Sequence, residues 1–226
     1  MTPVPPRPAS RRLRTPRRKP RNAYHHGHLR QALVDQAVRT IHRAGVERLT
    51  LRDVGASLGV SRTALYRHFA DKTALLAAVA TDGFRALRTG LQAAWDAADH
   101  GRAGLEAQGW AYARFALASP GHYRVMFGGF VAKANCDPEL TAEASGAFGV
   151  LVAALAELQQ QGLVREGDSE ALALFVWSAV HGVAMLAIDG QLTRPGVSLD
   201  PVLHTVVQRI WDGIAAPDEP RRTAGH

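Results

Sequence analysis

The sequence of 226 residues contains one cysteine, Cys136, which excludes internal disulfides and cysteine-based metal cages. A reducing, intracellular environment therefore fits best. Also missing are the glycine-rich phosphate loops, the dinucleotide fingerprint and the G-x-S-x-G motif of many enzymes. With 46% hydrophobic and 21% charged residues, the composition is that of a globular protein and excludes a wholly disordered or collagenous chain. We expect no catalytic residues and no cofactor.

Acidic residues are absent from positions 1–22, which carry eight Arg and Lys residues together with several prolines. Residues 23–72 hold eight basic and four acidic groups, whereas residues 73–226 hold eleven basic and sixteen acidic ones. The net charge of +7 therefore lies in the N-terminal third, which predicts a polyanion-binding end. We expect residues 1–22 to be a disordered arm. It is either a solvated tail or an arm that adds phosphate or minor-groove contacts.

Convincing alternation at period two is also missing, and apolar residues recur instead at helical spacing. The expected fold is all-α: a helix-turn-helix domain over 23–71, a helical ligand-binding and dimerisation domain over 72–216, and a disordered tail over 217–226. The spacing and the cap residues predict nine helices, at about 28–44, 51–58, 62–69, 72–99, 102–117, 123–127, 138–161, 169–189 and 200–214.

The longest stretch without an acidic or basic residue runs from Ala171 to Ile188 and approaches the length of a membrane span. It is rich in alanine and contains Ser178, His181 and Gly182. We interpret it as a helix that is buried by its own domain and by a partner subunit, and we expect no membrane association.

Residues 51–72 carry the strongest functional signal. A short helix, a turn through Gly59-Val60 and a second helix from Ser61 match a helix-turn-helix, whose second helix fits a major groove. Arg62 is the candidate for a bidentate contact with guanine. The alternative is an exposed polar helix in a helical bundle. The predicted DNA-contacting residues are Thr50, Arg52, Ser61, Arg62, Thr63, Tyr66, Arg67, His68 and Lys72.

Bulky or adaptable side chains in the middle and late helices are candidates for an apolar ligand pocket, although ordinary core packing is the better explanation for any one of them. This predicted ligand set comprises Trp110, Phe115, Tyr123, Met126, Phe127, Trp177, His181 and Met185. His181 either anchors a ligand or is a core histidine bonded to a backbone carbonyl. No metal site is expected at His25, His26 and His28, because no cysteine or carboxylate lies nearby at ligand spacing.

The segment LTLRDVGASLGVSRTALYRHFADKTALLAAV, at 49–79, resembles the DNA-binding domain of TetR-type transcriptional regulators. YHHGHLRQALVDQA, at 24–37, is similar to the start of one branch of that family. HYRVMF at 122–127 is similar to the C-terminal domain of that branch, as are Trp177, His181 and Gly182 in WSAVHG. One departure is Gly55, where the family usually has alanine; glycine there costs about 1 kcal/mol of helix stability.

The resemblance implies a cytoplasmic homodimer that binds double-stranded DNA at a palindromic operator. A helix over about 72–98 would link the DNA-binding helices to the ligand domain, and the last two helices would pair with their symmetry mates. Most such proteins are repressors that a small-molecule inducer releases from DNA. Two alternatives remain: a nonspecific DNA-coating protein with a steep salt dependence, and a ligand-binding protein that no longer reads DNA. The basic face of Arg62 and Lys72 argues against the second.

Overall fold

The computed structural model describes residues 28–130, 137–192 and 198–217. Within these ranges the chain forms nine helices, and the β pairing found there is a single isolated bridge between Val164 and Ala215. The all-α prediction is confirmed. The helices are α1 (Leu29–Ala44), α2 (Leu51–Ser57), α3 (Arg62–His68), α4 (Lys72–Asp96), α5 (Arg102–Ala118), α6 (Pro120–Phe127), α7 (Pro138–Gln160), α8 (Ser169–Ile188) and α9 (Leu199–Ile214).

Local signals explain where these helices begin and end. The side chains of Thr50, Ser61, Asp71, Asp137 and Asp168 each accept a hydrogen bond from an amide in the first turn of the helix that follows. Helix α6 begins three residues before its predicted start because Pro120 suits the first helical turn, where an amide hydrogen has no partner. Helix α4 ends at Asp96, slightly before its predicted end.

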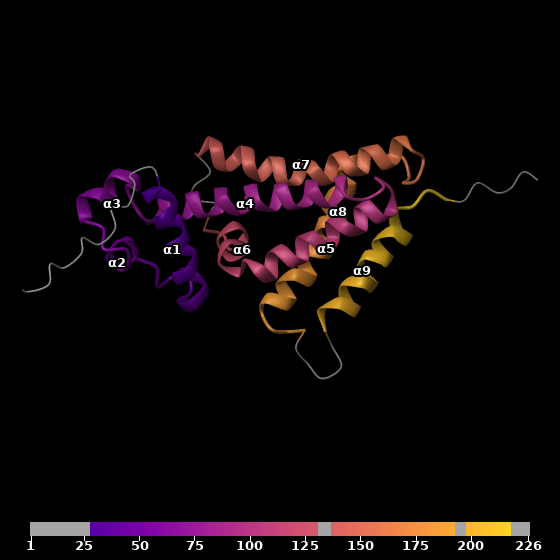
Figure 1. Cartoon of the computed structure of the whole chain (residues 1–226). Helices are drawn as coiled ribbons and strands as arrows, with labels where there is room; N and C mark the ends of the chain where they lie inside the picture. Colours follow the sequence, from indigo (N-terminus) through magenta and orange to yellow (C-terminus); the bar gives the residue numbers. More distant parts are fainter. Residues whose placement is uncertain (1–27, 131–136, 193–197, 218–226) are drawn as a thin grey trace, which may run out of the picture.

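The nine helices form two unequal groups (Figure 1). Helices α1–α3 gather at one end of the molecule, and the long helix α4 runs from them into the larger group, alongside α7. Lys72, at the start of α4, donates from Nζ to the carbonyl oxygens of Val46 and Glu47, at 2.7 and 3.3 Å. These bonds fasten α4 to the turn between α1 and α2. Helix α6 contacts both α1 and α4, and so lies between the two groups.

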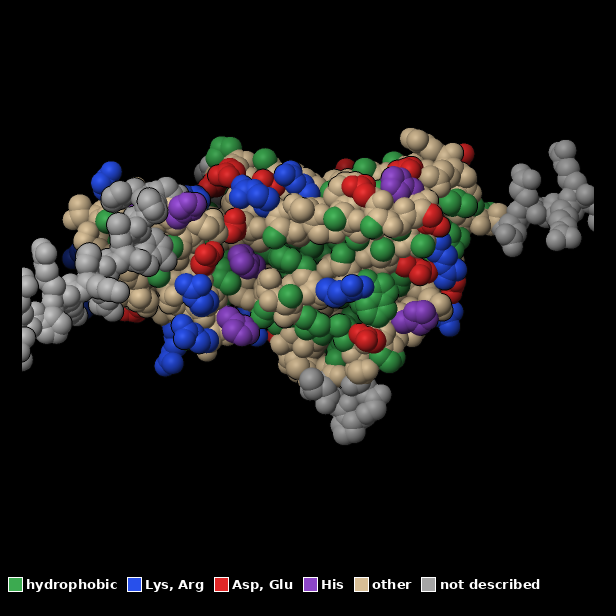
Figure 2. All heavy atoms as spheres, viewed as in Figure 1, with side chains coloured by type: hydrophobic (Ala, Val, Ile, Leu, Met, Phe, Trp, Pro, Cys, Tyr) green, Lys and Arg blue, Asp and Glu red, His purple; other side chains and the backbone are tan. Residues whose placement is uncertain are grey.

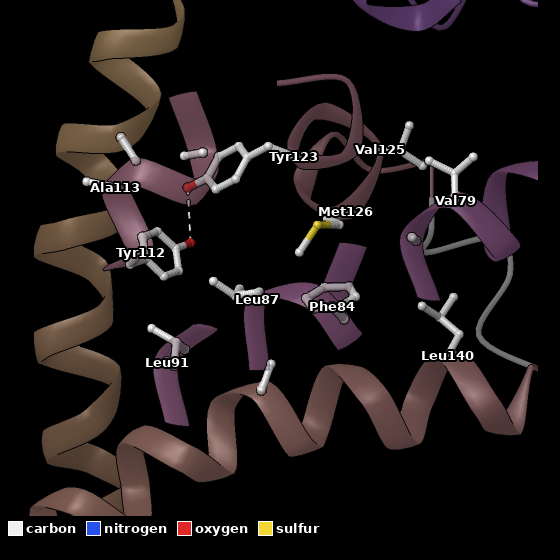
Figure 3. Packing of buried hydrophobic residues seen from close by; sticks show 14 of the residues in the cluster. Val79, Phe84, Leu87, Leu91, Tyr112, Ala113, Tyr123, Val125, Met126 and Leu140 are labelled. Carbon is white, nitrogen blue, oxygen red and sulfur yellow. Dashed lines mark hydrogen bonds between the residues drawn. The ribbon is translucent and has the colours of Figure 1, made fainter. Parts of the chain in front are cut away.

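A small core holds the N-terminal helices together. Leu33 and Ile41 from α1 are fully buried, as is Val54 from α2, and Leu65 of α3 packs with them. Behind α6, a second core fills the space between the larger helices (Figure 3). There Phe84 and Leu87 of α4 face Tyr112 of α5 and Met126 of α6.

Helices α7 and α8 are long and apolar enough to cross a membrane by composition alone. Both pack against other helices of the larger group, α7 on α4 and α8 on α5, with 22% and 28% of their apolar windows buried. Helix α8 nevertheless presents Leu174, Phe175 and Leu186 at the surface, each about half exposed. On the face shown in Figure 2, hydrophobic side chains gather over the larger group, whereas the N-terminal helices present Lys, Arg and His.

Some predictions fall outside the described residues. They concern the arm over 1–22, the tail beyond residue 217, and two members of the histidine cluster, His25 and His26. Among the residues that the structure does describe, no group of three His, Cys, Asp or Glu side chains is arranged to hold a metal ion.

Candidate DNA interface and ligand cavity

The turn between α2 and α3 is built by short-range bonds. Thr50 Oγ1 accepts from the Asp53 amide at 3.1 Å and donates to Asp53 Oδ2 at 2.7 Å, which closes the first turn of α2. The Val60 amide donates to the Gly55 carbonyl at 2.9 Å, and Gly59 takes a positive φ of 67° that few other residues adopt readily. The angle between α2 and α3 is therefore fixed by the local sequence.

Gly55 also sets how closely the two helices approach. A Cβ atom at this position would lie 3.1 Å from Leu65 Cδ2, closer than ordinary van der Waals contact. Glycine lowers the helix propensity of α2, but it also allows α3 to pack tightly against α2. The sequence analysis predicted only the first of these effects.

Two buried anchors, Leu65 and Phe69, hold the inner face of α3, so its other face is open to solvent. The guanidinium of Arg62 lies over the Tyr66 ring, 5.6 Å from its centroid, which orders both side chains at the start of the helix. The predicted DNA-contacting residues that are exposed are Thr50, Arg52, Ser61, Arg62, Thr63, Tyr66, Arg67 and His68. Lys72 is partly buried, and its ammonium is engaged by the two carbonyls at the α1–α2 turn.

The larger helical group contains a partly open cavity of about 270 Å³. Helices α4, α5, α7, α8 and α9 supply its walls, and Phe127 at the end of α6 closes one side. The lining is almost entirely apolar, and its aromatic members are Phe84, Tyr112, Phe127, Phe148, Trp177 and Trp211. A partly open apolar cavity of this kind suits a small organic molecule.

Two members of the predicted ligand set, Phe127 and Trp177, line this cavity. Tyr123 and His181 lie one layer behind its wall, in contact with lining residues. The others lie outside the lining: Trp110, Phe115, Met126 and Met185. Met126, for example, packs where Gly83 of α4 leaves room for its sulfur.

Sequence analysis did not place Gln108, Phe148 or Trp211 in the site, although all three line the cavity. The sequence feature that could have identified Gln108 is its polar amide on the apolar face of α5.

His181 belongs to a network of polar side chains. The interpretation of His181 as a core histidine bonded to a backbone carbonyl is therefore wrong about its bonding partner. Nδ1 of His181 is 2.8 Å from Tyr112 Oη and 2.7 Å from Tyr123 Oη. The two hydroxyls are 3.0 Å apart (Figure 3), and Trp177 Nε1 donates to Tyr112 Oη at 3.0 Å. Because Tyr112 and Trp177 also line the cavity, the network joins the cavity wall to α6.

Either direction of the bond between the two hydroxyls gives every hydroxyl hydrogen an acceptor, because both hydroxyls lie within reach of His181 Nδ1. In one such arrangement, Trp177 donates to Tyr112, Tyr112 donates to Tyr123, and Tyr123 donates to an unprotonated Nδ1 of His181. Burial favours the uncharged forms: it raises the pKa of Tyr112 to about 12, raises the pKa of Tyr123, and lowers the pKa of His181. The network is therefore neutral at physiological pH.

The fold and the exposed face of α3 define a helix-turn-helix DNA-binding protein whose larger helical group contains a cavity. Comparison with known proteins agrees. Residues 33–79 match the model of bacterial regulatory proteins of the tetR family, and residues 105–210 match the Tetracyclin repressor-like C-terminal domain. The chain belongs to the TetR family of transcriptional regulators, whose members bind DNA and small molecules and work as dimers.

Individual relatives support this assignment. An uncharacterized HTH-type transcriptional regulator of Mycobacterium tuberculosis is 30% identical over 200 residues, which is 87% of this chain and 84% of that protein. A solved structure of a protein with unknown function from Rhodococcus sp. RHA1 is 33% identical, covers 86% of this chain and 100% of its own, and has a TM-score of 0.77. SmeT in complex with triclosan shares the fold, with a TM-score of 0.56, 21% identity, and coverage of 84% of this chain and 92% of its own.

Proposed function

We propose that this protein is a cytoplasmic, dimeric repressor that reads a palindromic operator through α3 and leaves it when a small molecule fills the cavity. The observation that carries the proposal is the presence, in one chain, of an exposed face on α3 and an apolar cavity in the larger helical group. The triclosan complex of SmeT, a protein of the same fold, is in keeping with a ligand in this kind of domain.

Arg62 is proposed to contact base edges, because it lies at the start of α3, the part of a recognition helix that enters the groove first. A bidentate contact of arginine with guanine contributes about 1–3 kcal/mol of discrimination. Tyr66 and Thr63 are proposed to contact phosphate or thymine methyl groups. Lys72 is given a positioning role at the α1–α2 turn, since its ammonium already has two protein acceptors.

The exposed apolar residues of α8 support dimerisation through α8 and α9. Leu174, Phe175 and Leu186 form hydrophobic surface on a helix whose other face is buried, and such a surface is typical of an interface. Pairing of α8 and α9 with their symmetry mates would cover these side chains and fix the distance between two copies of α3.

Coupling between the cavity and DNA is proposed to run through α6. Tyr112 and Trp177 of the cavity wall bond to the network that includes Tyr123 of α6. The next contact is close, since a Cβ atom at Gly121 of α6 would lie 2.8 Å from the Val38 carbonyl oxygen of α1. For release, the ligand must bind the arrangement that does not fit DNA more tightly than the one that does.

The test is selection of bound fragments from a random duplex library at about 0.15 M salt. The intact protein is compared with Arg62→Ala and with Arg165→Ala, which removes an exposed arginine remote from α3. A two-fold symmetric motif that Arg62→Ala weakens and Arg165→Ala retains supports the proposal. Equal binding without any enriched motif means a nonspecific DNA-coating protein. If the protein selects a symmetric motif but no small molecule that binds the cavity releases it from DNA, only the proposed release by an inducer is contradicted.

A further inference from the structure

One polar side chain lies unpaired among the apolar residues of the cavity. Gln108 of α5 is 3% exposed, and neither its Nε2 nor its Oε1 has a hydrogen-bond partner among the described residues. An amide buried in this way costs about 1–3 kcal/mol of folding free energy. A leucine would fill the same place on the helix without that cost, so the amide is best explained by a partner from outside the chain.

The charges around the cavity restrict what that partner can be. Among the described residues, no Lys, Arg or His side chain contributes to the lining. A carboxylate or phosphate would therefore enter an apolar space without a counter-charge, which is strongly unfavourable.

Among the described lining residues, the acidic one is Glu106, and it is already ion-paired. Its Oε1 accepts from Arg102 Nε at 2.7 Å, and the Arg102 guanidinium lies over the Trp211 ring, 5.6 Å from its centroid. A cationic ligand would have to compete with this intramolecular ion pair, so the lining offers no free charge of either sign.

We infer that the effector is an uncharged, mostly apolar molecule with one polar group that both donates and accepts a hydrogen bond, paired with the Gln108 amide. A hydroxyl or a primary carboxamide meets this requirement, because it accepts from Nε2 and donates to Oε1. The inference rests on the proposed function in one respect, that this cavity is the effector site.

The experiment uses the full-length protein and four probes that share a ten-carbon chain: 1-decanol, decanamide, decanoate and decylammonium. Binding is followed by tryptophan fluorescence, since Trp177 and Trp211 line the cavity, and by calorimetry. The variant is Gln108→Leu, and the matched control is Gln92→Leu, an exposed glutamine of α4 outside this cavity.

We expect decanol and decanamide to bind at least tenfold more tightly than decanoate and decylammonium at pH 7.5. Gln108→Leu weakens decanol and decanamide about tenfold, in keeping with the loss of two hydrogen bonds, whereas Gln92→Leu leaves both affinities unchanged. Equal or tighter binding of either charged probe, an unchanged affinity in folded Gln108→Leu, or failure of all four probes to bind overturns the inference.

Operator release is measured separately, so that the two conclusions can fail independently. If decanol binds as expected and the protein stays on its DNA, the ligand class stands and release by an inducer is wrong. If no uncharged probe binds while fragment selection yields a symmetric motif, the ligand class is wrong and specific DNA binding stands.

Discussion

Removing one phenol oxygen at a time from the buried network should destabilise the protein to different extents. Tyr123 is fully buried and Tyr112 is 6% exposed, so burial alone predicts that Tyr123→Phe is the more harmful change. The hydrogen bonds predict the opposite order.

The reason is that the partners of Tyr123 can be satisfied without it. In Tyr123→Phe, the Tyr112 hydroxyl still accepts from Trp177 and can turn its hydrogen to His181 Nδ1, 2.8 Å away. One net hydrogen bond is lost, at about 1 kcal/mol. In Tyr112→Phe, the Trp177 indole N–H loses its acceptor, and this unpaired donor raises the cost to about 2–3 kcal/mol.

The assay is urea unfolding followed by circular dichroism at one protomer concentration, because dimerisation contributes to stability. Tyr66→Phe is the matched control: its hydroxyl is on an exposed residue, and the change should stay within about 0.5 kcal/mol. A loss for Tyr123→Phe equal to or larger than that for Tyr112→Phe would refute the reasoning that the unpaired Trp177 N–H sets the cost.

Two further predictions concern pH and helix contacts. Burial lowers the pKa of His181, and it lowers the pKa of His122 although Asp82 and Asp35 nearby act in the opposite direction. Below about pH 6.5 the unfolded chain therefore binds more protons than the folded protein. The free energy of unfolding should therefore fall between pH 7.5 and pH 5.5, and fall less in the double variant with glutamine at both positions; equal losses would contradict this assignment. Gly121→Ala should destabilise the protein by about 1–3 kcal/mol, because the added methyl meets the Val38 carbonyl. Gly90→Ala, in open space on α4, should instead stabilise it by about 0.5–1 kcal/mol, and thermal melting of both variants gives the comparison.

Helix boundaries and the recognition helix followed from the sequence because their causes are local. Thr50, Ser61 and Asp71 cap the helices that follow them, and Gly59 supplies the positive φ of the turn, all through bonds between residues close in the chain. The helical spacing of apolar residues then identified the outer face of α3. The strongest part of the family resemblance lies in the same short segment.

The cavity and the histidine network could not be derived in this way. Periodicity shows that a residue faces inward, but it does not show which inward-facing residues of separate helices meet a space instead of one another. Gln108 lines the cavity because its position on α5 faces the space between the larger helices. Met126 does not line it, because Gly83 of α4 leaves room for the Met126 sulfur. His181 meets Tyr112 and Tyr123 across 69 and 58 positions of sequence. By itself the sequence determined the helices, their caps and the exposed face of α3. The packing of distant helices decided the shape, polarity and hydrogen bonding of the cavity region, since these depend on contacts between residues far apart in the chain.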